Sequence, residues 1–362
     1  MKGLVSKVRA KKTKTREKQA KKADVEQLPW QHSKYTGLAI GLVLWSLSVC
    51  LMLVDYLLAP LPNSDYLLPM YSKAALLLVS IFSAGVGLKI VEPKILRKNS
   101  MILLLSIVGF LSLAAVRTAL YVNDAFFGFR DELLIFLLPI SITPLLITIL
   151  LGKRTAMVAG FWSSIAIAVL LNNSFQLLMM GIITTLVASE AASAVKTRSK
   201  IIRAGVIMIG ASKTIFVFAA TATNWQTADV QTIAHQAGAC LVSGFLSAVA
   251  TVILLPFLER PFRITSNITL LELADLGHPL LQRLAIEAPG TYHHSLVVAN
   301  LAQAAADEIG ANSLLTRICS YFHDEGKLTK PDFFAENIQQ QQNPHDNLPP
   351  SMSTLVITAN VK

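Results

Sequence analysis

Long apolar runs separated by short polar connections dominate the chain between residues 36 and 258. A helix needs about 20 mostly apolar residues to cross the hydrocarbon core of a bilayer. The pattern therefore predicts a transmembrane domain of eight helices. The expected spans are residues 36–59, 67–91, 101–122, 132–151, 155–171, 175–194, 201–222 and 232–258.

Basic residues follow every second predicted span. The connections after the second, fourth, sixth and eighth spans each contain two or more Lys or Arg, such as Lys153-Arg154 after the fourth. The intervening connections contain a single one, Arg130. Because cytoplasmic loops carry an excess of Lys and Arg, the pattern predicts a multi-pass protein with both termini in the cytoplasm.

Composition agrees with a membrane protein. Apolar residues make up 53% of the 362 residues and charged ones only 15%, whereas a soluble domain averages about 25% charged. Residues 1–29 hold ten Lys or Arg and few apolar side chains, so we expect a disordered cytoplasmic tail. Beside a span, this tail favours the anionic lipid bilayer over nucleic acid as its partner. The three cysteines show no CxxC spacing, which indicates reduced thiols.

The composition changes after the last span. Residues 259–286 have an amphipathic pattern and predict a connector helix, with Asn267 as a candidate N-cap. The pair His278-Pro279 predicts a kink or break in it, with a structural role for the histidine. Residues 287–362 then form a separate helical domain.

Candidate metal ligands concentrate in this last domain. His293 and His294 stand just ahead of one helical pattern, and a second helical pattern ends in His323-Asp324. Neutral imidazole and carboxylate are ligands that divalent Zn, Mn or Fe accept. A solvated helix-end pair is the alternative for His323-Asp324, but the upstream histidine pair favours a metal site.

The segments APGTYHHS and HDEGK, together with PDFFAENIQQQQNPHDNLPPSMSTLVITANVK, carry a family resemblance. The chain resembles the seven-transmembrane HD proteins of bacteria, which are membrane-anchored phosphodiesterases of cyclic di-AMP signalling. The resemblance implies an all-α fold, with one anchor span and seven further spans before a cytosolic HD domain. It also implies the bacterial inner membrane, and attack of a metal-activated water on a phosphodiester of cyclic di-AMP.

The resemblance assigns roles to individual residues. His294, His323 and Asp324 match the family's metal ligands, with Asp324 shared between two ions that are expected to be Mn or Fe. Lys327 matches the lysine expected to meet substrate phosphate, so Asp324 and Lys327 are the catalytic candidates. His293 is expected to pack against the metal ligands and not to bind a metal itself.

Three departures from the family qualify these roles. No large extracytoplasmic domain stands between the first two spans, and Glu325 occupies a usually apolar position, beside the metals or in the core. Asn360 stands where the family has a histidine, and the sequence ends at Lys362 within the HD domain. We therefore expect a truncated HD domain that by itself binds at most one ion weakly. Two alternatives remain: an enzyme completed by a second polypeptide or a homo-oligomer, and an inactive membrane protein that binds nucleotide or a partner.

Overall fold

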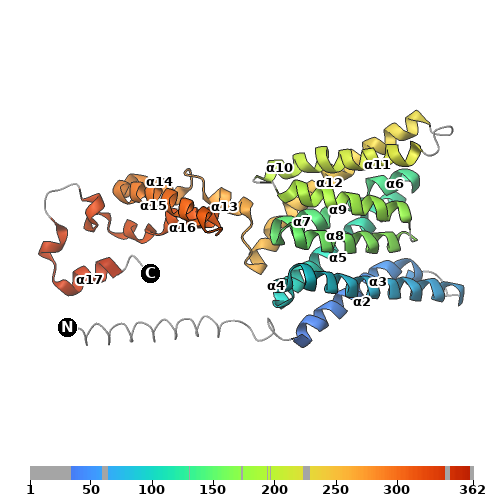
Figure 1. The fold of residues 1–362 in the computed structure, drawn as a ribbon, viewed down its shortest axis with the longest axis horizontal. Helices are drawn as coiled ribbons and strands as arrows, with labels where there is room; N and C mark the ends of the chain where they lie inside the picture. Colours follow the sequence, from blue (N-terminus) through green and yellow to red (C-terminus); the bar gives the residue numbers. More distant parts are fainter. Residues whose placement is uncertain are drawn as a thin grey trace. The chain divides into compact units, whose positions relative to one another are not determined.

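The computed structural model divides into two compact units, one formed by residues 1–195 and 199–264, the other by 196–198 and 265–362. It describes residues 34–58, 64–129, 131–172, 174–193, 195, 197–222, 229–338 and 343–358, without the side chains of 34, 38, 52–58, 64–70, 131, 132 and 222. The predicted tail at residues 1–29 and the candidate Asn360 lie outside the described residues. All described regular elements are helical, which confirms the all-α prediction (Figure 1).

The first unit is a bundle of helices. In chain order they are α2 (Lys34–Leu58), α3 (Ser64–Val91), α4 (Pro93–Leu96), α5 (Asn99–Val122), α6 (Asp131–Leu137), α7 (Ile142–Leu151), α8 (Lys153–Leu170), α9 (Phe175–Ser193), α10 (Arg198–Arg203), α11 (Ala211–Ala222) and α12 (Val230–Phe262). Wider π-helical turns continue α5 at Asn123–Phe127 and join α10 to α11 at Ala204–Gly210.

Six stretches of helix in the described residues are long and apolar enough to cross a membrane. They coincide with six of the eight predicted spans. Helix α8 matches the predicted span 155–171 but is not among the six, because Lys153, Arg154 and two serines dilute its apolar character. The predicted span 36–59 corresponds to α2 but reaches residues outside the description. The count of eight stays a prediction.

Small residues let the helices of the first unit approach closely. A Cβ added to Gly160 of α8 would stand 2.4 Å from the Thr185 side chain of α9. A Cβ on Gly244 of α12 would stand 2.3 Å from the carbonyl oxygen of Gly205. Close backbone approach at Gly is typical of helix packing in bilayers, where lipid supplies no hydrophobic drive between helices.

The predicted span 132–151 is interrupted between α6 and α7. Pro139 disfavours helical geometry at the preceding residue, so the carbonyl of Leu138 does not meet the N–H of Ile142 as it would in a continuous helix. Lys213, fully buried, donates from Nζ to that carbonyl at 3.1 Å. Ser243 Oγ donates to the same oxygen at 2.6 Å and accepts from Lys213 Nζ at 2.6 Å. The break is therefore satisfied inside the bundle.

The second unit contains α13 (Asn267–Leu273), α14 (Pro279–Glu287), α15 (Pro289–Glu308), α16 (Ser313–Phe322) and α17 (Pro350–Thr358), with short 3₁₀ turns between α16 and α17. The connector predicted over residues 259–286 begins later than expected, because α12 extends to Phe262, and it consists of two helices, α13 and α14. The N-cap of α13 is Ser266, whose Oγ accepts from the Thr269 N–H at 3.3 Å, so the choice of Asn267 is wrong.

The predicted break at His278-Pro279 is confirmed. His278 is the N-cap of α14, and its Nδ1 accepts from the Leu280 N–H at 3.3 Å. Its ring also packs edge-on against Phe322 with centroids 5.5 Å apart. The histidine therefore has the structural role expected from the sequence.

Candidate metal centre

Two adjacent helices, α15 and α16, carry the candidate ligands (Figure 1). Helix α15 begins at Pro289, a residue suited to the first helical turn. After α15 the chain turns at Gly310, where φ is +66°. Asn312 then caps α16, its side chain accepting from the Leu315 N–H at 3.0 Å. Buried Ala299 of α15 packs with Tyr321 of α16, which fixes the two helices against each other.

The structure brings His294, His323 and Asp324 together. Each offers one ligand atom, and these atoms all lie within 4.8 Å of one another. The two imidazole rings have centroids 5.5 Å apart, and the Asp324 carboxylate is buried while both histidines are exposed. This set of donors and its spacing fit one divalent ion.

A backbone contact orients His323. Its Nδ1 lies 2.8 Å from the carbonyl oxygen of Ser320. A proton on Nδ1 satisfies that carbonyl and leaves the lone pair of Nε2 available to a metal. Nε2 is the atom on the Asp324 side, 3.3 Å from Oδ2. The contact therefore favours a proton on Nδ1, the arrangement in which Nε2 can bind a metal.

His293 does not join the cluster. It is exposed and is not part of the three-residue group. Both histidines lie inside α15 rather than just ahead of it, so the predicted start of this helix is wrong. Pro289 is compatible with the first helical position, and the helix therefore begins about two turns earlier than the apolar pattern suggested.

Lys327 is held by two carboxylates. Its Nζ lies 2.7 Å from Asp324 Oδ2 and makes an ion pair with Glu336. It also lies 5.2 Å from the ring centroid of Phe334, within cation–π range. Burial by itself lowers the pKa of Lys327, but the hydrogen bonds and charges of Asp324 and Glu336 outweigh burial and raise it. The side chain is therefore a protonated ammonium beside the candidate ligands.

Glu336 connects this lysine to the start of α15. One of its carboxylate oxygens accepts from Thr291 Oγ at 3.1 Å. Burial favours a raised pKa for Glu336, but the hydrogen bond from Lys327 and further polar contacts outweigh burial and lower it. Glu336 is therefore a carboxylate at neutral pH and can hold Lys327 and Thr291 at once.

Asn337 fixes the same turn against α15. Its Oδ1 accepts from the Thr291 N–H at 2.9 Å, and its Nδ2 donates to Thr291 Oγ at 2.8 Å. A Cβ on Gly290 would stand 1.8 Å from the Glu336 carbonyl oxygen, so only glycine permits this contact. Sequence reasoning missed these residues because the partners are 45 or 46 positions apart and no local pattern joins them.

Two further sequence interpretations have outcomes here. Glu325 is exposed and is not a member of the ligand group, so its expected place beside the metals or in the core is wrong. His345 lies in the 3₁₀ turn Pro344–Asn347, and its Nε2 lies 2.9 Å from the Phe333 carbonyl oxygen. The sequence Asn343-Pro344-His345-Asp346 predicts a turn at this place, and the structure confirms it.

Comparisons with known proteins follow the same division of the chain. Residues 67–266 match the family described as 7TM receptor with intracellular HD hydrolase, and residues 291–352 match the HD domain. The chain is 38% identical over 232 residues to the cyclic-di-AMP phosphodiesterase PgpH of Listeria monocytogenes, covering 63% of this chain and 32% of that protein. It is 34% identical over 266 residues to PgpH of Bacillus subtilis, covering 72% of this chain and 37% of that protein.

Solved structures of the L. monocytogenes PgpH HD domain also match. Its crystal structure is 54% identical, with a TM-score of 0.23, covering 23% of this chain and 40% of that one. The crystal structure of the same domain in complex with cyclic-di-AMP is 54% identical, with a TM-score of 0.23, covering 23% and 39%.

The chain spans about a third of the length of the two PgpH relatives. The first family match covers more than half of the chain. It contains all six stretches of helix that are long and apolar enough to cross a membrane. These findings describe a multi-pass membrane domain followed by an HD region that contains the three convergent candidate ligands. The chain belongs to the family of 7TM receptors with an intracellular HD hydrolase.

Proposed function

We propose that this chain acts in the hydrolysis of a phosphodiester of cyclic di-AMP, with His294, His323 and Asp324 holding a divalent metal ion. The observation that carries the proposal is the convergence of these three ligand atoms, from two helices, within 4.8 Å. Cyclic di-AMP is suggested by the PgpH relatives, two of which are named cyclic-di-AMP phosphodiesterases. Mn or Fe suits the imidazole and carboxylate set.

The residues around the ion have separate tasks. When bound, a divalent ion polarises a phosphoryl oxygen and lowers the pKa of a coordinated water. Asp324 and the two histidines hold the position at which substrate phosphate is bound. An ammonium has three N–H donors, and Asp324 and Glu336 use two of those of Lys327. The third can donate to a phosphate oxygen without the loss of either ion pair.

The proposal includes the location of the HD region at the membrane. The transmembrane domain at residues 36–258 places the HD region at 287–362 on the cytoplasmic face of a bacterial inner membrane, with both termini in the cytoplasm. A second polypeptide or a second copy of the chain packs against the HD region. The apolar side chains exposed on α15 beyond His294 support such a partner, since Val297 is 43% and Leu301 68% exposed.

Hydrolysis by the purified full chain tests the proposal. In detergent with MnCl₂, cyclic di-AMP should yield its ring-opened linear dinucleotide, separated by chromatography. Asp324→Asn and His294→Ala should abolish the product. The matched controls Glu325→Gln and His293→Ala change neighbours outside the ligand group and should retain it.

The assay also distinguishes the second candidate function. An inactive nucleotide-binding protein would retain cyclic di-AMP in equilibrium dialysis and release no linear product. Product formation that survives both Asp324→Asn and His294→Ala would refute the assignment of this site.

A further inference from the structure

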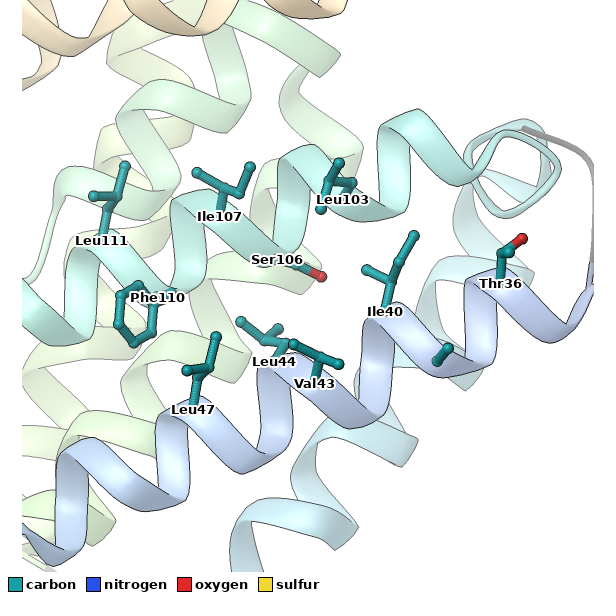
Figure 2. Close-up of a pocket in the computed structure, with 11 residues that line it drawn as sticks. Thr36, Ile40, Val43, Leu44, Leu47, Leu103, Ser106, Ile107, Phe110 and Leu111 are labelled. Carbon is teal, nitrogen blue, oxygen red and sulfur yellow. The ribbon is translucent and has the colours of Figure 1, made fainter. Parts of the chain in front are cut away.

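An apolar groove runs along the seam between α2 and α5 in the first unit. Its volume is about 480 Å³. From α2 it is lined by Ile40, Val43 and Leu47, and from α5 by Leu103, Ile107 and Leu111. Figure 2 shows these side chains along the seam, with the hydroxyl of Thr36 at one end and that of Ser106 midway. All the other side chains that line the groove are hydrocarbon.

The groove has the length of one membrane leaflet. From Thr36 to Leu47 the rise along α2 is roughly 16 Å, at about 1.5 Å per residue. Half of the hydrocarbon core of a bilayer is about 15 Å. Since α5 is among the candidate membrane spans, a ligand from the surrounding lipid can enter the groove along its length.

Basic residues lie in the chain next to the Thr36 end of the groove. Asn99 Nδ2, at the first residue of α5, donates to Thr36 Oγ at 2.6 Å and so joins the beginnings of the two helices. Arg97 and Lys98 immediately precede Asn99, and both are exposed. The same short connection also contains exposed Lys94 and one acidic residue, the half-buried Glu92. Its net charge is therefore positive.

The shape of the groove selects among occupants. Its volume divided by its length gives a cross-section of about 30 Å². A polar ligand would lose its hydration against walls of carbon without compensating hydrogen bonds. A single hydrocarbon chain is compatible with both the width and the chemistry.

We propose that this groove binds a membrane phospholipid with an anionic headgroup. One acyl chain lies between α2 and α5, and the headgroup phosphate lies against Arg97 and Lys98. The juxtaposition of an apolar groove one leaflet long with a basic cluster at one end carries the assignment, since a basic residue near a membrane surface attracts anionic lipid. The site is separate from the metal ligands and does not depend on the proposed catalysis.

Photocrosslinking of the full chain in nanodiscs tests the proposal. Phosphatidylglycerol or phosphatidylcholine carrying a diazirine in one acyl chain is added at equal mole fraction, and labelled peptides are located by mass spectrometry. Residues 36–47 and 103–111 should be labelled by phosphatidylglycerol roughly five- to tenfold more than by phosphatidylcholine. The double substitution Arg97→Gln/Lys98→Gln should remove that preference.

A matched control removes the same charge elsewhere. Lys200→Gln/Arg203→Gln neutralises two exposed basic residues on α10 and should leave labelling of the groove unchanged. Ile107→Trp fills the groove and should reduce labelling by both lipids. The two double substitutions change only exposed side chains and should leave the helices intact. Equal labelling by the two lipids, an equal loss in the control, or crosslinks to a second copy at these residues would overturn the proposal.

Discussion

Asn337→Ala should loosen the start of α15, the helix that carries His294. Asn337 is buried, at 6% exposure, and its Oδ1 accepts from the Thr291 N–H at 2.9 Å. Thr291 is the third residue of α15, where a backbone N–H has no partner within the helix. Asn337 therefore caps α15 from a distant turn of the chain.

The expected magnitude follows from the groups left behind. A buried donor without an acceptor costs about 1–3 kcal/mol. Thr291 Oγ loses the bond from Asn337 but keeps its contact with Glu336, so the main loss is that of the N–H. A local destabilisation of about 2 kcal/mol lowers the protection of this turn against hydrogen exchange roughly 30-fold, since about 1.4 kcal/mol is tenfold.

Hydrogen exchange by mass spectrometry on the full chain measures this effect directly. The peptide over residues 289–296 should exchange roughly 30-fold faster in Asn337→Ala, whereas peptides from the transmembrane helices should be unchanged. Asn347→Ala is the matched control, because Asn347 is an exposed asparagine in the next turn region. Protection within threefold of the unmodified chain would show that water replaces the cap and that Asn337 does not hold this turn.

Three other outcomes are expected. Elemental analysis of the purified chain should find at most one Mn or Fe ion per chain, lost in Asp324→Asn, because the described residues bring three ligand atoms together; two tightly held ions would contradict a site made of these three residues. The pKa of Glu336 is lowered by its contacts in the folded chain. The ion pair with Lys327 therefore stabilises the fold fully above the ordinary carboxyl pKa near 4.3, and this stabilisation is lost as the pH falls through the lowered pKa. In thermal melts, the fall in melting temperature between neutral and acid pH should therefore be smaller for Glu336→Gln than for the unmodified chain. Tags at residues 62 and 345 should report opposite sides of the membrane, and one shared side would refute eight spans.

Local signals in the sequence predicted the parts of the site that depend on neighbouring residues. The end of α15 near Gly310, the helix before His323-Asp324 and the break at His278-Pro279 each follow from residues within a few positions. Helix caps, glycine turns and proline act over one turn of chain, so a single sequence reveals them. The ligand set itself was predicted from the family resemblance, and the structure places its three members together.

Contacts over long sequence separations were not predictable in the same way. Lys213 is 75 positions from Leu138, and its burial alone gives no indication of which carbonyl it meets. The exposure of Glu325 was also not predicted, and this residue lies in the 3₁₀ turn Glu325–Thr329. Both depend on tertiary packing, which binary patterning does not encode.

The polar contacts around the ligands form a closed connection between the two helices. Thr291 of α15 bonds Glu336, Glu336 pairs with Lys327, and Lys327 pairs with Asp324 at the end of α16. The carboxylate is therefore positioned before any ion arrives, which reduces the ordering cost of binding. The same lysine places a positive charge beside the ion and opposes it. Since Lys327 does both, Lys327→Met should disorder Asp324 and also remove the charge repulsion with the ion. Glu336→Gln should leave a second N–H of the lysine available to phosphate, at little cost to metal affinity.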